Sequence, residues 1–417
     1  MKNVAIAEPP VELVTISLRI LMCITLILFI IGCSSVHVKE HPFAGDPHKP
    51  KSIFVFLDGT RNEEKAHTNV WRLYDLISNT SKKDPQTTCI YIEGVGSTDE
   101  AEFVETALGA LLGYGMEARI NKGYTFIAKN YNHGDDIYIF GFSRGAHEAR
   151  SLAGLLAYAG VPPIMAGDDD KHLMKIANNI IEVTKQTSDK DYLDKWKAWK
   201  PGQAPLLSAE IKEEIKRDVR PVEVTFLGVW DTVPGSSLKE FGVCKENENS
   251  KEGDRYKSNS YPTIRQIAHA VSIDEKRSKY RPLLLCPKIN PENPGKISEV
   301  WFPGAHSDVG GGYKDEKEQP IIELPGISLN WMIGLLSEYY KPASDIPNVV
   351  ENPKGPAHWS ISGIASKGSK CEDRKPPMNA EALHSSYFKR ISSSPVPLYV
   401  NKREWKMLAY PIACPGP

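Results

Sequence analysis

The stretch that decides the fold is "DIYIFGFSRGAHEAR", from Asp136 to Arg150. A run of β-branched and aromatic residues, typical of a buried strand, ends at Gly141, and Ser143 and Gly145 follow. A strand, a Gly-x-Ser-x-Gly turn and a helix form a nucleophile elbow, in which a strained backbone makes the serine hydroxyl project beyond the sheet. The sequence therefore predicts that Ser143 is a nucleophile, and that a Cβ at either glycine would collide with neighbouring backbone.

Short apolar strands and helices alternate along the rest of the chain. The expected strands are "KSIFVFLDGT" (51–60), "TCIYIEGVG" (88–96), "DIYIF" (136–140), "VEVTFLGVWDT" (222–232) and "SEVWFPGAH" (298–306). The expected helices are 69–78, capped by Thr68 or Asn69, and 101–131, 144–160, "TIRQIAHAVS" (263–272) and 328–340. This alternation predicts an α/β fold, a mostly parallel sheet with helices on both faces. Together with the nucleophile elbow, it predicts a fold of the α/β-hydrolase type.

The expected domain organisation has three parts: a signal or anchor at 1–33, a polar tether at 34–50, and one α/β-hydrolase domain at 51–417. Two polar or charged segments interrupt that domain, at 164–221 and 235–260, and we interpret them as insertions. The first is either a cap over a pocket or a solvated excursion. From Pro342 onward the chain is rich in proline and is expected to be irregular.

The N-terminal segment carries an apolar run from Ile20 to Ile31, with Arg19 before it. A bilayer span needs about 20 residues, so this run is closer to the apolar region of a secretory signal. It ends in Gly32-Cys33, which resembles a bacterial lipobox with a lipidated Cys33. Because no aspartate follows the cysteine, the pattern resembles that of outer-membrane lipoproteins facing the periplasm. The alternative is a short uncleaved anchor in the inner membrane, and either reading makes the protein membrane-anchored.

Charge and cysteine content limit the classes of partner and cofactor. The chain has 51 basic and 52 acidic residues and a net charge of −1, so no global field attracts it to nucleic acid. No Cys or His spacing typical of a metal site is present, and neither a metal nor a cofactor is expected. Besides two cysteines in the N-terminal segment, the chain has Cys89, Cys244, Cys286, Cys371 and Cys414. These form one or two disulfides or remain buried thiols.

A serine nucleophile needs a base and an orienting acid, and in this fold they follow it in the order acid, then histidine. Asp231 comes directly after the strand "VTFLGVW", and His306 lies in the loop after "SEVWFPG". The expected triad is therefore Ser143, Asp231 and His306. Asp308 is the rival acid and His147 the rival base.

The oxyanion hole needs two backbone N–H donors. One is expected from Arg144, the residue after the nucleophile. The second is expected from Gly59 or Thr60 in "FLDGT", a loop that Asp58 and Thr60 would hold by side-chain hydrogen bonds. The alternative is a plain Asp-Gly turn.

Three other motifs give weaker signals. "GVGSTD" (94–99) imitates a dinucleotide loop but lacks its third glycine. "DVGGGY" (308–313) is interpreted as a flexible loop beside His306 rather than a phosphate site. "GDDDKH" (167–172) is interpreted as a solvated acidic turn rather than a cation site.

Four segments carry a family likeness: "FLDGTRNEEKAHTNVWRL", "GDDIYIFGFSRGAHEARSLAGLL", "FLGVWDTV" and "WFPGAHSDVGGGY". Together, over about Ser52 to Tyr340, they resemble the uncharacterised α/β-hydrolase domain of type VI secretion phospholipase effectors. The resemblance implies the triad Ser143, Asp231 and His306, and a serine esterase of the phospholipase A type acting on membrane lipids. It leaves a secretion or immunity partner undefined. The alternative is a catalytically silent, lipid-anchored binding or protective module of the cell envelope.

The lipobox interpretation predicts the effect of Cys33→Ser. The variant should lose its membrane fraction or be mis-sorted, because acyl chains contribute about 0.8 kcal/mol per buried CH₂ to membrane binding. Fractionation and labelled-palmitate incorporation measure this. A variant that stays in the same membrane fraction would favour the uncleaved anchor.

Overall fold

The computed structural model of the protein describes residues 36–417 except 61, 83, 95–107, 234–258, 288–289, 291–294, 362–367, 380, 402–403 and 416–417. Val38–Pro417 forms one compact unit, separate from Met1–His37. The expected signal with Cys33, most of the 235–260 insertion and most of "GVGSTD" lie outside the described residues. None of the helices in the described ranges is both long and apolar enough to cross a membrane.

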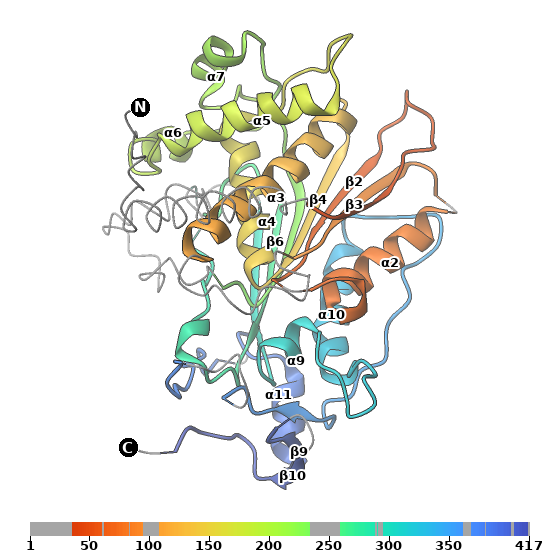
Figure 1. The fold of residues 1–417 in the computed structure, drawn as a ribbon, viewed down its shortest axis with the longest axis vertical. Coiled ribbons are helices and arrows are strands. Elements are labelled where there is room, and N and C mark those ends of the chain that lie inside the picture. Colours follow the sequence, from red (N-terminus) through yellow and green to blue (C-terminus); the bar gives the residue numbers. More distant parts are fainter. Residues whose placement is uncertain are drawn as a thin grey trace, which may run out of the picture. The chain divides into compact units, whose positions relative to one another are not determined.

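A seven-stranded sheet forms the centre of the fold, in the order β1-β3-β2-β4-β5-β6-β7 (Figure 1). All neighbouring pairs are parallel except β1 and β3. The strands are β1 Val38–His41, β2 Ser52–Leu57, β3 Thr87–Ile92, β4 Asp136–Phe142, β5 Val224–Trp230, β6 Gln266–Ser272 and β7 Lys296–Phe302. The sheet confirms the predicted α/β fold of the α/β-hydrolase type.

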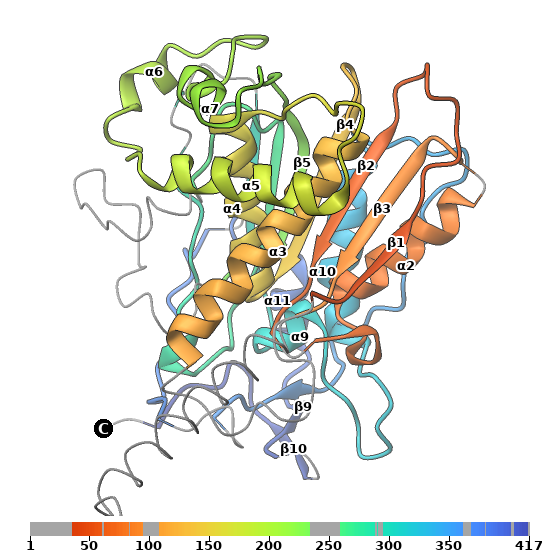
Figure 2. The same cartoon turned by 45° about the horizontal axis from the view of Figure 1, so that its top comes forward.

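Helices cover both faces of this sheet (Figures 1 and 2). α2 (Asn69–Ser81) and α10 (Glu323–Leu336) lie on one face, and α3 (Leu108–Asn130) and α4 (Arg144–Ala159) lie on the other. Thr68 caps α2, as one of the two expected caps, because its side chain accepts a hydrogen bond from the Trp71 N–H. The remaining short helices beside the sheet are η1 Glu64–Ala66, η3 Ser278–Tyr280 and α9 His306–Gly310.

The two faces of the sheet differ in chemistry, because successive side chains of a strand point to opposite faces. Toward α2 and α10 the strands present stacked aromatic rings: Phe54 lies 4.3 Å from Tyr138, and Phe56 lies 5.3 Å from Phe140, between centroids. Toward α3 the sheet is aliphatic, and a Cβ on Gly123 would lie 3.2 Å from Val55 Cγ1. Both faces of the sheet are therefore buried, which explains why the strands are continuous apolar runs in the sequence.

The insertion at 164–221 forms a further helical layer of α5 (Asp170–Lys185), α6 (Leu193–Lys197) and α7 (Ser208–Ile215). It leaves and rejoins the fold at a bridge between Val161 and Arg220, at the end of α4 far from Ser143. At 1.5 Å per residue, α4 separates these points by roughly 24 Å. The layer packs on α3 and α4, at the end of the sheet opposite α9 (Figure 1). It is thus a packed layer rather than a solvated excursion, and its placement does not suit a cap over the nucleophile.

The acidic turn "GDDDKH" begins this layer and is occupied by structural contacts. Asp168 forms a bidentate ion pair with Arg217 at 2.6 and 2.8 Å. Asp169 caps α5 by accepting from the His172 N–H, and Asp170 pairs with Lys129 at 2.6 Å. The turn is solvated, as expected, since all of its residues except Asp168 are exposed, and its carboxylates also pair with neighbouring elements.

The prediction of a helix at "TIRQIAHAVS" is wrong, because residues Gln266–Ser272 form strand β6. The segment carries apolar residues at helical spacing, and its polar residues interrupt the expected strand pattern. Those polar groups are buried but satisfied: His269 Nδ1 lies 2.9 Å from Glu299 Oε2, and the Ser272 hydroxyl donates to the Gly304 carbonyl. Tertiary partners that the local sequence does not show allow this strand.

Two further expectations need correction. The tether at 34–50 contains β1, which pairs with β3 and extends the sheet. The chain after Pro342 is not wholly irregular, since it forms a second sheet of order β10-β9-β8 and a helix. These elements are β8 Ala357–His358, α11 Ser385–Ser392, β9 Val396–Tyr399 and β10 Trp405–Leu408. Each is too short for a clear periodic signal.

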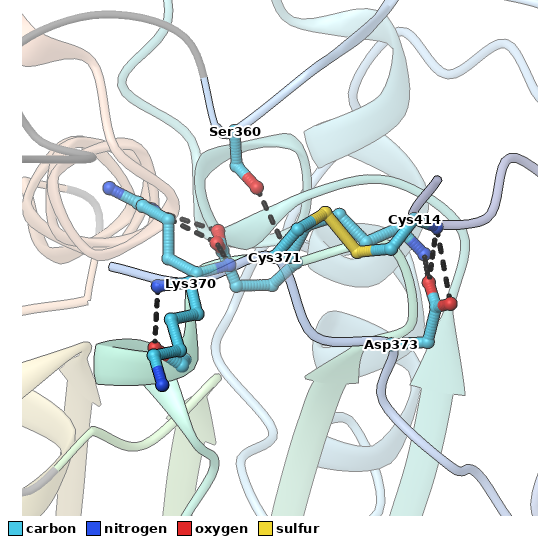
Figure 3. Close-up of a disulfide and its surroundings, with 9 residues drawn as sticks. Ser360, Lys370, Cys371, Asp373 and Cys414 are labelled. Carbon is cyan, nitrogen blue, oxygen red and sulfur yellow. Dashed lines mark hydrogen bonds and ion pairs between the residues drawn. A yellow bond between two sulfur atoms is a disulfide. The ribbon is translucent and has the colours of Figure 1, made fainter. Parts of the chain in front are cut away.

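The cysteines fall into both expected classes. Cys371 and Cys414 form a disulfide across 43 residues (Figure 3). Cys286 is also disulfide-bonded. Cys89 is a buried free thiol in β3.

We expect the double substitution Cys371→Ser/Cys414→Ser to destabilise the C-terminal region, because opening a loop of this length restores about 4 kcal/mol of unfolded-state entropy. Urea unfolding of both proteins measures the difference. In reductant, wild type and variant should coincide, since the wild-type bridge is then open too. Equal stability without reductant would contradict the prediction.

Candidate active site

Ser143 lies on the turn between β4 and α4. Its φ of 59° and ψ of −123° are strained for a residue with a Cβ. A Cβ on Gly141 would lie 2.3 Å from the Gly145 carbonyl oxygen, and a Cβ on Gly145 would lie 2.2 Å from the Leu57 carbonyl oxygen. Only glycine fits at both places, so the structure has the elbow geometry that the sequence predicts.

Asp231 follows the neighbouring strand β5 at the same edge of the sheet. Phe142 is in register with Trp230, so Ser143 and Asp231 are the next residues of adjacent strands. The Val233 N–H donates to the Ser143 carbonyl at 3.2 Å. Asp231 also has a positive φ of 37°, which turns the chain sharply as it leaves β5.

His306 begins α9, just beyond β7, and its imidazole reaches Asp231. Nδ1 lies 2.5 Å from Asp231 Oδ2, and both side chains are buried. The His306 ring packs 4.6 Å from the ring of Phe142, the residue before Ser143. Because the carboxylate can only accept, Nδ1 carries a proton and Nε2 remains to accept one. The structure thus brings all three predicted triad residues to one edge of the sheet.

The rival acid binds other partners, and the rival base is buried within α4. Asp308 accepts hydrogen bonds from His358 Nδ1 at 2.6 Å and from the Ala305 N–H at 2.8 Å. It therefore holds the start of α9 rather than the His306 ring. His147 is fully buried in α4, and burial lowers its pKa to about 3, so it is neutral at physiological pH.

Electrostatics favour an ionised acid beside a neutral base. Burial alone would raise the pKa of Asp231, but Arg374 and His306 more than offset this and hold it below the ordinary value. Burial lowers the pKa of His306 more than the Asp231 charge raises it. At neutral pH the imidazole is therefore available as a proton acceptor.

Two residues in this site were not expected from the sequence. Arg374 donates two hydrogen bonds to the Asp231 carboxylate, at 2.5 and 3.1 Å. Glu275 accepts from the His306 N–H at 3.2 Å. Neither lies in a motif, and Arg374 comes from the proline-rich C-terminal part, so no local signal points to them.

The loop "FLDGT" lies against the nucleophile, as the oxyanion prediction requires. A Cβ on Gly59 would lie 3.1 Å from Ser143 Cβ. However, the Gly59 N–H donates to Asp58 Oδ1 at 2.7 Å, so it is not available to an oxyanion in this conformation. The Thr60 N–H is the better second candidate. The Arg144 N–H belongs to the first turn of α4, where N–H groups have no preceding helical carbonyl.

Asp58 holds this loop, as expected, but its partner side chains come from elsewhere. Its Oδ2 accepts from Thr68 Oγ1 at 2.5 Å and from the Tyr91 hydroxyl at 2.7 Å. Arg119 donates to the Asp58 carbonyl and pairs with Glu148 of α4 at 3.1 Å. The oxyanion loop is therefore connected to the nucleophile helix through a buried ion pair.

The glycines of "DVGGGY" pack tightly instead of forming a flexible loop. A Cβ on Gly310 would lie 2.0 Å from the Phe142 ring, and one on Gly311 would lie 2.8 Å from Thr68 Cα. The loop thus packs between Phe142 of β4 and Thr68, the residue that caps α2. These contacts fix the segment that carries His306.

A depression of about 670 Å³ is lined by Leu285–Pro287 and Lys296–Glu299. It lies beside the amino end of β7, whereas His306 follows the carboxyl end. We therefore do not assign it to the reaction.

Comparisons with known proteins relate this chain to one family. Residues 51–334 match the family described as "T6SS, Phospholipase effector Tle1-like, catalytic domain". An uncharacterized protein of Saccharomyces cerevisiae is 26% identical over 271 residues, which are 61% of this chain and 35% of that protein. The chain thus spans about a third of the length of that relative.

Solved structures with a similar arrangement have low sequence identity. An uncharacterized protein from Pseudomonas aeruginosa is 18% identical with a TM-score of 0.41, covering 73% of this chain and 48% of that one. The Tle1 effector bound to the VgrG spike is 18% identical with a TM-score of 0.30, covering 67% and 58%. Esterase 2 of Thermogutta terrifontis is 11% identical with a TM-score of 0.36, covering 74% and 91%.

The geometry distinguishes the two aspartates near His306. Asp231→Asn should lower kcat by about 10⁴, because an amide favours the wrong imidazole tautomer. Asp308→Asn should cost far less, since its carboxylate faces His358. Steady-state hydrolysis of a soluble ester measures both variants. Equal losses would contradict the assignment of Asp231 as the acid.

Proposed function

This chain belongs to the T6SS Tle1-like phospholipase effector catalytic-domain family, and from that premise we propose that it is a serine hydrolase cleaving acyl esters of lipids. Ser143 is the nucleophile, His306 the general base and acid, and Asp231 the orienting acid. The enzyme class comes from the site and the family, while the lipid substrate comes from the family alone.

The observation that carries the proposal is the buried Asp231–His306 pair beside a serine on a strained turn. The pair has a 2.5 Å separation and no polar alternative partner for the Nδ1 proton among the described residues. A buried carboxylate is costly in free energy unless it is paired and hydrogen-bonded. Here its partners leave the imidazole neutral and oriented, as a general base requires.

The proposed reaction has two half-reactions. The Ser143 hydroxyl attacks the acyl carbonyl while His306 Nε2 takes its proton, and the resulting imidazolium is stabilised by Asp231. The tetrahedral oxyanion accepts hydrogen bonds from the Arg144 and Thr60 N–H groups. The imidazolium then protonates the leaving alcohol and the acyl-serine forms. A water molecule, deprotonated by His306, attacks that ester. The imidazolium returns its proton to the leaving Ser143 oxygen, which releases the fatty acid and restores the neutral base.

Membrane anchoring at Cys33 and an outer-membrane location remain predictions from the sequence. They suit a lipid hydrolase, because an anchored enzyme meets its substrate without a basic docking face. A secretion or immunity partner also remains a prediction. The competing function, a catalytically silent binding or protective module, predicts a triad that does not react.

Ser143→Ala tests the proposal. It should lower kcat by about 10⁶ on a soluble ester and abolish labelling by a fluorophosphonate probe, because the nucleophile is lost. Ser337→Ala, at an exposed helix end, is the matched control and should behave as wild type.

Folded wild-type protein that neither hydrolyses esters nor reacts with the probe would favour the silent module. Activity on soluble esters without fatty-acid release from phospholipid vesicles would leave an esterase but reject the lipid substrate. Mass analysis of the lipid products identifies the acyl position that is cleaved.

A further inference from the structure

Arg374 fills the side of Asp231 that His306 leaves open. Its two terminal nitrogens donate to the two carboxylate oxygens, and its side chain is only 6% exposed. The same nitrogens also donate to the Ser272 carbonyl at 2.8 Å and the Tyr280 carbonyl at 2.5 Å. The guanidinium is therefore fixed by four acceptors, with the planar fork that matches a carboxylate.

The segment that carries Arg374 is docked along the loop after β6. The Ser278 N–H donates to the Lys370 carbonyl at 3.0 Å, and the Glu372 N–H donates to the Lys276 carbonyl at 2.8 Å. The Lys276 ammonium pairs with Asp373 at 2.7 Å.

A disulfide also links the segment that carries Arg374 to the C-terminal end of the chain. Figure 3 shows the disulfide between Cys371 and Cys414, and the Asp373 carboxylate accepting from the Cys414 N–H at 3.1 Å. Arg374 thus comes from outside the matched range of 51–334, but is held rigidly beside the acid.

We propose that Arg374 is a positioning residue that fixes the rotation of the Asp231 carboxylate, and through it the His306 ring. The inference rests on the proposed function for its kinetic consequences. Asp231 Oδ1 otherwise accepts only from the Ser272 N–H, at 3.0 Å, among the described residues. A buried carboxylate with one neutral donor on that oxygen would turn more freely.

The effect on proton affinity has a definite sign. Asp231 favours the imidazolium form of His306, and the positive charge of Arg374 opposes it. Removing that charge should raise the pKa of His306 and move the acid limb of kcat/KM to higher pH, because the base must be unprotonated in the free enzyme. The other titratable groups that face His306 are Glu275, Arg277 and Tyr280, which the substitution leaves in place.

The test compares Arg374→Met with Arg374→Lys. Partners behind a reacting group typically contribute about 10- to 100-fold, so both variants should lose kcat in that range. Only Arg374→Met should shift the acid limb upward, because lysine keeps the charge but not the fork. Lys375→Met, which removes the next charge along the same segment at an exposed position, is the control and should match wild type.

A readout independent of catalysis separates this inference from the proposed function. The low-field NMR resonance of the His306 Nδ1 proton, identified by its loss in Asp231→Asn, should titrate at a higher pH in Arg374→Met. If wild type is inactive but the resonance shifts, the positioning role stands and the enzymatic function fails. An unchanged resonance and pH profile in folded Arg374→Met would overturn the inference.

Discussion

The buried charge of Asp231 is the constraint on which the site depends. A carboxylate without solvent access is tolerated only when paired and hydrogen-bonded, and here three distant parts of the chain converge on it. The end of β6 supplies the Ser272 N–H, α9 supplies the His306 imidazole, and the C-terminal segment supplies the Arg374 guanidinium. The strand order places the Ser272 N–H and the His306 imidazole at one edge of the sheet. The C-terminal segment, which the disulfide closes, adds the third partner of the carboxylate, the Arg374 guanidinium.

A second buried carboxylate in the same site shows how partners decide ionisation. Asp58 accepts from the Gly59 N–H and from the hydroxyls of Thr68 and Tyr91, which are all neutral donors. Burial dominates there and raises the pKa of Asp58, although the nearby Arg119 guanidinium, which donates to the Asp58 backbone carbonyl, opposes it. The pKa of Asp231 is lowered, because the Arg374 guanidinium and His306 bind its carboxylate directly. One carboxyl therefore organises backbone through neutral hydrogen bonds, and the other supplies negative charge to a base.

The sequence predicts most of the sheet and the triad, for a physical reason. Strands β2 to β5 are buried on both faces, and their apolar runs are local signals that end at the chemically important residues. The prediction of a helix at β6 is wrong because the polar side chains of His269 and Ser272 hide the strand pattern. Their hydrogen-bond partners, Glu299 and Gly304, come from β7 and the loop after it, so the local sequence does not show them. The role of Arg374 could not be predicted from the sequence either, because it depends on a contact with Asp231, which is 143 residues away in the chain.

The strain at Ser143 and Asp231 explains why the supporting contacts are so dense. Each residue has a positive φ, and such conformations cost about 1–3 kcal/mol and persist only when the surroundings over-determine them. Gly145 packed on Leu57 fixes the first turn, and the register of β4 with β5 fixes the second. The sheet holds the backbone of both turns, and the end of β6 supplies the Ser272 N–H to Asp231 Oδ1. The partners of Oδ2 among the described residues, His306 and Arg374, lie outside the strands, so the strands and the C-terminal segment together define the geometry of this carboxylate.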